Sequence, residues 1–522
     1  MKRVAFRSVQ PILGFNVWLA ANNHRVGPST LRTGKTDSFH ELPTSIQLHS
    51  NNATDIRTSM ANLQLPPELL LLVMKQVDYG EEFSAAQNSL RNAILVNREW
   101  AEAGSYILWN CPPVTALAAA SPDRRQYYAN KVTEMFFEGE EDSKHHATFK
   151  DLNFPRLKIV HVPRVKLKKH GQLYLAQYMQ PQLIEFHFWG GGVCENALMT
   201  LASNCPSLKD LNLECPIDNS SQDQLLEFFR SQNSIEVIYL GYGWAGLVTP
   251  ALLAGLASLE SLEKLDISSL AEDHAIHMGL GMSPEPFSNL QNLHMRVESK
   301  SVARLVSAAP SLSVLFLIIE DSDYDALASL KPLSNLVHLE LTFLDDTELS
   351  PQGFRALENL KGLEVLLIES RGALLEATWM DDGIFAEFIS NLPNVTSLDF
   401  KLDCGITIET LTSLARTHPN IESFDFYSDF DLSDWSRLTN PLFPNLVRFV
   451  IEAPFIEGRT RRYEAVVGHM RESTNAKAVQ SRKCPVQRAS FTDCRCSASP
   501  LSETRTTMFP RVSRGFALSA CD

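Results

Sequence analysis

The stretch CPSLKDLNLEC, residues 205–215, contains the pattern on which the fold of this chain depends. Its three leucines stand in an L-x-x-L-x-L spacing, and Pro206 precedes the first of them. The second and third leucines alternate with polar residues, which is typical of a strand with one buried face. The segment therefore predicts a short strand whose leucines enter a core, while Asp210, Asn212 and Glu214 point away from it.

The same template recurs along most of the chain. An anchor followed by apolar residues three and five positions later occurs thirteen times, at Val132, Leu157, Leu183, Leu208, Ile235, Leu262, Leu290, Leu312, Leu336, Leu363, Val395, Ile421 and Leu446. The intervals run from 22 to 32 residues, and only one of them exceeds 28. Leucine-rich repeats have a period of about 20 to 29 residues. The chain is therefore expected to contain about thirteen such repeats.

Helical stretches are expected between the anchors. They include residues 195–205, 221–232, 301–309 and 382–392, and several end just before a proline. A proline at this position ends a helix and favours an extended entry into the strand. One strand and one helix per repeat, stacked on their neighbours, bury what a single repeat cannot bury alone. The expected fold is an α/β leucine-rich-repeat solenoid, a horseshoe with a parallel sheet inside and helices outside.

Two amphipathic helical runs precede the repeats. Residues 65–77 have proline in the first helical turn, and Leu69, Val73 and Val77 fall on one helical face. Residues 90–109 form the second run, with apolar residues at helical spacing. A helical unit of about 45 residues is close to the lower limit for independent folding. Such a unit usually depends on a partner.

These two runs resemble the F-box family. The resemblance rests on three blocks in order, LPPEL at 65–69, LVNREW at 95–100 and LW at 108–109. Many F-boxes have Cys or Ser where Asn97 stands, so the match departs from the family at that position. The alternative is an unrelated helical cap on the repeats.

The resemblance to F-box/leucine-rich-repeat proteins implies a substrate receptor of a cullin-type ubiquitin ligase. The F-box of such proteins docks on a Skp1-like adaptor, and the repeats hold a protein target for ubiquitination by other subunits. The chain would itself catalyse no reaction and would work in the cytoplasm, the nucleus or both. The residues expected to face the adaptor are Leu65, Pro66, Leu69, Val73, Val96, Trp100 and Leu108. The alternative function is a repeat scaffold or inhibitor without a role in ubiquitination.

The expected domain organisation has five parts. These are a disordered N-terminal extension at 1–60, an F-box-like helical domain at 61–110, a linker or cap at 111–130, the repeats at 131–456, and a mostly disordered basic tail at 457–522. The first acidic residue of the N-terminal extension is Asp37, which leaves a targeting segment as an alternative there.

Charge and composition restrict the class of partner. The chain has a net charge of −14, and its ends, 1–60 and 459–522, carry +4 and +7, so residues 61–458 carry −25. An acidic body argues against nucleic acid and favours a protein partner with a basic surface. No apolar run is long enough to span a membrane, which predicts a soluble protein. The nine cysteines have irregular spacing and no C-x-x-C, so neither a disulfide framework nor a zinc site is indicated.

Two motifs could suggest a bound cofactor or metal. Residues 241–246 read G-x-G-x-x-G and follow an expected strand, with Asp266 twenty residues further on, as in a dinucleotide-binding loop. The repeat spacing continues unbroken across this segment, and Asp266 falls on an exposed strand position, so no cofactor is expected. His145 and His146 follow Asp142, but adjacent histidines point in different directions, and a solvated acidic loop is expected rather than a metal site.

The residues that point away from the core form the expected binding wall. The fifth position of each repeat reads Phe136, His161, His187, Asn212, Tyr239, Asp266, His294, Phe316, Glu340, Leu367, Asp399, Asp425 and Val450. The patch hypothesised to recognise a protein target comprises Glu185, His187, Trp189, Asp210, Asn212, Glu214, Tyr239, Tyr242 and Trp244. Aromatic side chains are favoured binding anchors, and the carboxylates would select a basic segment. The alternative is ordinary surface or self-packed loop aromatics.

A second candidate surface is apolar. It comprises Val314, Phe316, Ile318, Val365 and Leu367, and the C-terminal tail could instead cover it.

Overall fold

A computed structural model of the chain describes eight ranges of residues and two single residues. These are residues 66–79, 90, 92–139, 142, 144–163, 175–190, 196–217, 222–323, 325–427 and 443–452. The chain divides into residues 1–69 and 70–522, and the repeats belong to the second unit. The predictions for 1–60, for Leu65 and for 457–522 lie outside the described residues.

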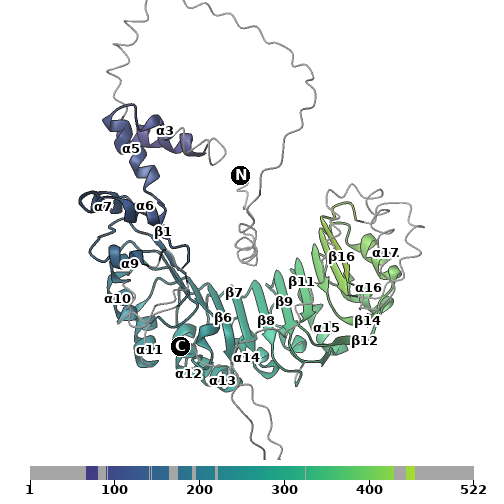
Figure 1. The fold of residues 1–522 in the computed structure, drawn as a ribbon. Helices are drawn as coiled ribbons and strands as arrows, with labels where there is room; N and C mark the ends of the chain where they lie inside the picture. The colour runs from purple at the N-terminus through teal and green to yellow at the C-terminus, as the bar shows by residue number, and fades with distance from the viewer. Residues whose placement is uncertain are drawn as a thin grey trace, which may run out of the picture. The chain divides into compact units, whose positions relative to one another are not determined.

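One parallel sheet runs through the repeat region, and its strands follow one another in chain order (Figure 1). Within the described residues it has thirteen strands: β1 (Glu134–Phe136), β2 (Ile159–Val162), β3 (Glu185–Phe188), β4 (Asp210–Leu213), β5 (Val237–Leu240), β6 (Lys264–Ala271), β7 (Asn292–Val297), β8 (Val314–Ile319), β9 (His338–Phe343), β11 (Val365–Ser370), β13 (Ser397–Phe400), β15 (Ser423–Tyr427) and β16 (Arg448–Glu452). Each strand begins two residues after an anchor of the repeat. The predicted α/β solenoid is therefore confirmed.

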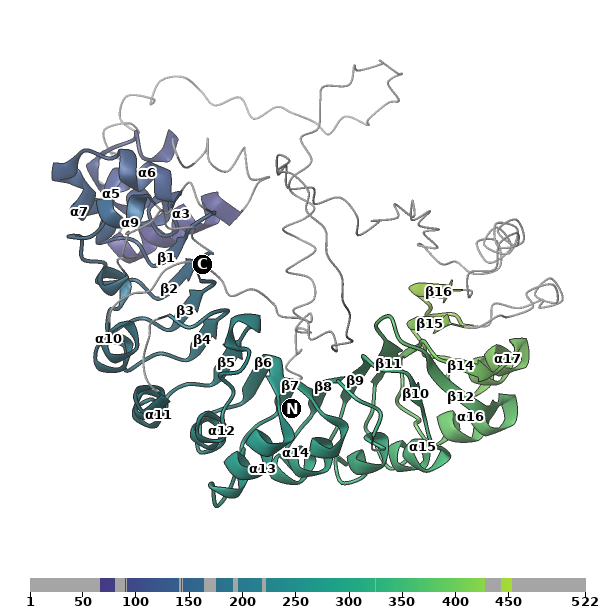
Figure 2. The same ribbon diagram turned by 60° about the horizontal axis from the view of Figure 1, so that its bottom comes forward.

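Helices connect the strands and lie on the outer side of the curved sheet (Figures 1 and 2). They are α9 (His145–Thr148), η1 (Ala176–Tyr178), α10 (Ala197–Asn204), α11 (Gln222–Ser231), η2 (Tyr242–Trp244), α12 (Pro250–Ala257), α13 (Asp273–Gly281), η3 (Ser299–Ser301), α14 (Val302–Ala308), η4 (Leu327–Leu330), α15 (Pro351–Leu357), α16 (Asp382–Ser390) and α17 (Ile408–Thr417). The expected helices at 195–205, 221–232, 301–309 and 382–392 correspond to α10, α11, α14 and α16. A small parallel sheet of β10 (Thr347–Glu348), β12 (Leu375–Asp381) and β14 (Asp403–Gly405) joins three of the connections.

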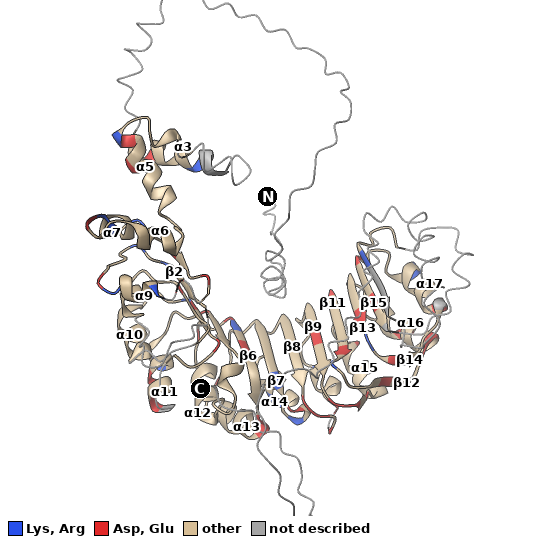
Figure 3. Ribbon diagram, in the orientation of Figure 1, with Lys and Arg blue, Asp and Glu red and all other residues tan. Residues whose placement is uncertain are grey.

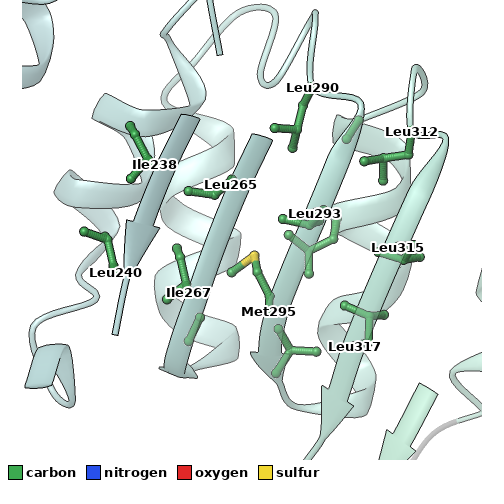
Figure 4. Packing of buried hydrophobic residues seen from close by; sticks show 14 of the residues in the cluster. Ile238, Leu240, Leu265, Ile267, Leu290, Leu293, Met295, Leu312, Leu315 and Leu317 are labelled. Carbon is green, nitrogen blue, oxygen red and sulfur yellow. The ribbon is translucent and has the colours of Figure 1, made fainter. Parts of the chain in front are cut away.

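The core is a set of apolar columns that run across the strands. Leu265, Leu293 and Leu315 occupy equivalent register positions on β6, β7 and β8, and all three are buried (Figure 4). Full burial of one leucine side chain stabilises the fold by roughly 1.5–3 kcal/mol. Because each side chain contacts its equivalent in the next repeat, the repeats stabilise one another rather than folding separately.

Among the described residues, α3 (Pro67–Tyr79) and α5 (Arg98–Leu108) come before the segment 111–130 in chain order. Leu70 and Met74 of α3 belong to a small buried cluster with Leu90 and Ala103. The prediction of one helical run over 90–109 was wrong. The chain turns after residue 93, and the helix begins again because the Asn97 side chain accepts a hydrogen bond of 2.9 Å from the Trp100 amide.

The segment 111–130 contains two short helices, α6 (Val114–Ala119) and α7 (Pro122–Ala129). Lys131 follows them and is only 3 % exposed. Its ammonium group lies 2.6 Å from the Glu102 carboxylate of α5 and 3.0 Å from the Tyr127 hydroxyl. It also lies 4.2 Å from the centroid of the Tyr106 ring. This buried lysine therefore connects α5 to the start of the first repeat.

The segment around His146 is not the solvated acidic loop expected from the sequence. His146 is buried on α9, with Nδ1 3.1 Å from the Tyr178 hydroxyl oxygen and its ring 4.2 Å from that of Phe137. Asp142 is buried too, and its carboxylate accepts a hydrogen bond of 2.7 Å from the Glu138 amide. Burial lowers the pKa of His146 to about 4, so the ring is neutral and packs as part of the core.

None of the helices in the described residues is both long enough and apolar enough to cross a bilayer.

Candidate protein-binding face

The inner face of the sheet carries the side chains expected there. In most strands buried and half-buried residues alternate, as in β3, where Phe186 and Phe188 are buried while Glu185 and His187 are half-buried. The strand register aligns the fifth positions in one row, from Phe136 opposite His161 on β2 onward. This alignment confirms the predicted row of outward residues, and it decides which of them are neighbours.

Five of the nine predicted target-binding residues meet on three adjacent strands. Glu185 pairs with Asp210 in the register of β3 and β4, and His187 pairs with Asn212. Asn212 in turn pairs with Tyr239 on β5. The structure thus places two carboxylates, an imidazole, an amide and a phenol on one continuous strip of the inner face.

His161 extends this strip toward the N-terminal end of the sheet. Its ring stacks on that of His187 with centroids 4.0 Å apart and an interplanar angle of 16°. The Phe136 ring then meets His161 edge-on at 4.6 Å. On the other side, His187 Nε2 lies 3.2 Å from Asp210 Oδ1.

Partial burial sets the protonation of these groups. Burial, with the neighbouring His187 as a smaller contribution, lowers the pKa of His161 to about 4, so its imidazole is neutral at pH 7. Burial and the nearby Asp210 carboxylate raise the pKa of Glu185 above its ordinary value. The strip therefore holds carboxylates that water solvates poorly, and a cation would stabilise their charged forms.

Tyr239 is held by its neighbours on the next strand. Its hydroxyl accepts a hydrogen bond of 3.2 Å from Ser268, and burial raises its pKa above the ordinary tyrosine value. Asp266, beside it in the row, lies 2.8 Å from Nδ1 of His294. These contacts fix the orientation of the ring and leave it as a half-buried phenol.

The aromatic residues beyond the strand ends differ from one another. Tyr242 is exposed and Trp189 is half-buried, so both remain candidates for contact with a partner. Including Trp244 in the surface patch was wrong, because Trp244 is 1 % exposed and its indole Nε1 donates a hydrogen bond of 2.8 Å to the Leu213 carbonyl oxygen. The indole fills the core between two repeats and cannot meet a target.

The glycines of the G-x-G-x-x-G segment have a packing role. The Gly243 amide donates a hydrogen bond of 3.0 Å to the Glu214 carbonyl oxygen. A Cβ atom at Gly243 would lie 2.7 Å from that oxygen and would clash with Cys215 Sγ. The short η2 turn therefore fits against the preceding repeat only because these positions lack a side chain.

The second, apolar candidate surface is interrupted by polar residues. Strand β9 lies between β8 and β11, and it places His338 and Glu340 between the two groups of apolar side chains. The Phe316 ring contacts the His338 ring at 4.6 Å. The five residues therefore form two half-buried groups rather than one continuous patch.

The C-terminal strands carry a group of neighbouring charged residues that was not singled out from the sequence, and Asp425 is buried among them (Figure 3). Asp399 and Asp425 are neighbours in register on β13 and β15. Lys401 lies 2.9 Å from Glu369 and 3.9 Å from Asp399, and Arg448 lies 3.1 Å from Asp425. Burial, and then the Asp425 charge, raise the pKa of Asp399 to about 7.

The residues predicted to face an adaptor are mostly exposed. Leu69, Val73, Val96 and Leu108 are exposed apolar side chains, and Pro66 is exposed as well. Trp100 differs from them, because it packs against the cluster around Leu70 and Met74. Leu72 and Leu95 are also exposed, although the resemblance did not single them out.

Comparisons with known proteins show distant structural similarity and no family match. No protein-family model and no curated protein sequence matches the chain. Among solved structures, the mouse RP105/MD-1 complex is similar at 16 % identity and a TM-score of 0.31, covering 62 % of this chain and 59 % of that one. The repeat protein LegL7 of Legionella pneumophila has 10 % identity and a TM-score of 0.27, covering 65 % and 97 % of the two chains. The yeast Rad7 and Elc1 complex has 17 % identity and a TM-score of 0.26, covering 63 % and 93 %.

The fold assignment thus rests on the chain itself. Its described residues place thirteen parallel strands in sequence order, and the three apolar positions of the L-x-x-L-x-L template are buried in each of the first twelve repeats. The chain folds as an α/β solenoid of the leucine-rich-repeat type, with α3 and α5 before the repeats in chain order.

Proposed function

We propose that this protein is an F-box-type substrate receptor that docks on a Skp1-like adaptor and presents a target held by the repeats for ubiquitination. One observation carries the proposal most directly. Leu95 and Val96, in the second motif block, are adjacent apolar residues that are 76 % and 60 % exposed, and grouped exposed apolar side chains are typical of a protein-interaction surface. The Asn97 cap holds this turn in place at the start of α5. A partner that covers the turn would remove its apolar surface from water.

The contacts of Lys131 support the same function. A receptor must hold its target at a fixed distance from the adaptor. The buried ammonium ties Glu102 on α5 to the chain just before β1. Motion of α5 relative to the first repeat would break the Lys131–Glu102 ion pair and leave a buried ammonium group without its carboxylate, which is destabilising.

The inner face of the sheet supports target binding. The strip from His161 to Tyr239 combines aromatic rings with carboxylates, a composition suited to a basic protein segment. In this proposal the chain binds and positions, other subunits catalyse the transfer, and the protein works in the cytoplasm, the nucleus or both.

The test is capture of a purified Skp1-like adaptor by the full chain. We expect Val96→Asp to reduce adaptor capture by at least about tenfold, because it places a charge in an apolar contact. Ile384→Asp is the matched control, since Ile384 is an exposed apolar residue on α16 in the repeats. Capture should be unchanged in the control.

Two outcomes would contradict the proposal. One is wild-type protein that does not capture the adaptor at all. The other is equal capture by the Val96→Asp and wild-type proteins. Either would favour the scaffold or inhibitor, which needs no adaptor.

A further inference from the structure

Three side chains on the inner face form a cluster with the composition of a metal site. His161 lies on β2, and Glu185 and His187 lie on β3 with one residue between them. One ligand atom from each lies within 4.8 Å of the other two. Two residues at positions i and i+2 of a strand point to the same face, and the facing residue of the next strand lies beside them. The backbone register therefore holds this cluster together.

We propose that His161, Glu185 and His187 bind a divalent transition-metal ion, with Zn²⁺ as the ion that suits them. Two imidazole nitrogens and one carboxylate oxygen are an established set of zinc ligands in sites that keep a fourth position open. The residues face the inner side of the sheet, so the fourth position is available to a donor atom from outside the chain.

The unused nitrogen atoms are the second observation. Nε2 of His161 and Nε2 of His187 are both removed from water and have no hydrogen-bond partner among the described residues. The approach of Asp210 Oδ1 to His187 Nε2, at 3.2 Å, is not aligned as a hydrogen bond. A buried polar atom left without a partner costs about 1–3 kcal/mol, and coordination to a metal would satisfy both nitrogens.

Charge favours the same ligand. Glu185 and Asp210 are register neighbours on β3 and β4, and both are half-buried. A divalent cation beside them would balance two carboxylates that repel one another. Two of the three cluster members are stacked imidazoles, which distinguishes the cluster from an ordinary acidic surface.

Only a small adjustment is needed to form the site. Tetrahedral zinc with bonds of about 2.0–2.2 Å holds its ligand atoms about 3.4 Å apart. The ligand atoms, now within 4.8 Å of one another, would approach by up to about 1.4 Å through changes in side-chain torsion. The stacked rings must also tilt so that their nitrogen lone pairs converge on the ion.

The experiment measures Zn²⁺ binding to the purified full chain in competition with a chromogenic chelator. We expect one Zn²⁺ per chain, and an affinity loss of at least about tenfold in His161→Asn and in Glu185→Gln. His294→Asn is the matched control, because His294 is another imidazole on the inner face and lies 2.8 Å from Asp266, outside the cluster. Its affinity should equal that of wild type.

Cobalt(II) provides a spectroscopic readout that does not depend on affinity alone. Bound Co²⁺ should show the intense visible absorption of four-coordinate cobalt, and both cluster variants should lose it. Added imidazole should shift these bands if the fourth position is exchangeable. Unshifted bands would show a closed site and contradict the open position.

Two results would overturn the metal site. One is the absence of a stoichiometric ion, and the other is equal binding by wild type and both variants, which would indicate adventitious binding to other histidines. Circular dichroism checks the fold of each variant. If His161→Asn does not fold, the Zn²⁺ affinity of Glu185→Gln tests the proposal. The site does not depend on the adaptor proposal, since the measurement needs only this chain.

Discussion

The contribution of a lysine–glutamate ion pair to stability depends on how deeply the lysine is buried. Lys131 and Lys209 each pair with a glutamate at about the same distance, 2.6 Å for Glu102 and 2.5 Å for Glu236. Lys131 is 3 % exposed, whereas Lys209 is 51 % exposed. The buried ammonium also lies against the Tyr106 and Tyr127 rings. The two ion pairs have nearly equal distances, but the Lys131 pair should therefore contribute more to stability than the Lys209 pair.

Replacing Lys131 with alanine should lower the free energy of unfolding by about 1–3 kcal/mol, since it removes the cation–π contacts and leaves Glu102 unpaired. Lys209→Ala is the matched control and should cost less than about 1 kcal/mol, because water screens its exposed pair. Chemical denaturation of the two variants measures the difference. Equal costs would show that burial adds nothing to the Lys131 pair.

Asp399 should make stability depend on pH. The pKa of Asp399 is about 7 in the folded protein and 3.8 in its ordinary state. The folded state therefore holds a proton that the unfolded state releases, so this group's contribution to stability falls as pH rises from about 4 to 7.

Asp399→Asn removes the titrating carboxyl group and with it the loss of stability between pH 4 and 7. The variant's stability relative to wild type should increase across that pH range by about 4 kcal/mol, because each unit of pKa difference corresponds to about 1.4 kcal/mol, and it should stay constant above that range. Thermal denaturation from pH 4 to 8 measures the difference. Asp403→Asn, an exposed aspartate on β14, is the control and should show no such trend. A constant difference for Asp399→Asn would contradict the prediction.

Among the secondary-structure elements, the η2 turn (Tyr242–Trp244) shows how one repeat is fitted to the next. Its Gly241 and Gly243 amides donate hydrogen bonds to carbonyl oxygens of the preceding repeat, and Trp244 fills the space below. The turn and its neighbour are therefore one packed unit, although Gly243 and Glu214 are 29 residues apart in the sequence.

Gly243→Ala should destabilise the protein by about 1–3 kcal/mol, because the added Cβ meets a backbone oxygen that cannot move independently of its strand. Gly281→Ala is the control, since a Cβ there has nothing within 4 Å. Its stability should be unchanged or slightly increased. Thermal denaturation compares the two. Unchanged stability in Gly243→Ala, with lost binding of a dinucleotide, would instead support a cofactor loop.

At the scale of the whole molecule, the stack of repeats converts distant sequence positions into neighbours. The His161 and His187 rings are 26 residues apart in sequence and 4.0 Å apart in space. The predicted row of outward residues contained both, but the patch chosen from it left His161 out. The signal was the equal repeat position of the two histidines, and the strand register made them neighbours.

The sequence by itself determined the strands, their register and the buried face of each repeat. These follow from a spacing of two residues within each strand and a recurring period, and both are local properties. Leu208, Leu211 and Leu213 are fully buried, while Asp210 and Asn212 remain on the inner face, as the pattern predicts.

The tertiary structure alone decided which side chains leave the surface and which ones meet. Trp244 and His146 were expected in solvent, and both are buried, because residues of another repeat, Leu213 and Tyr178, supply their hydrogen bonds. The cluster of His161, Glu185 and His187 likewise forms across two strands. Each of these outcomes depends on contacts about 25 to 32 residues away in sequence, which no local pattern records.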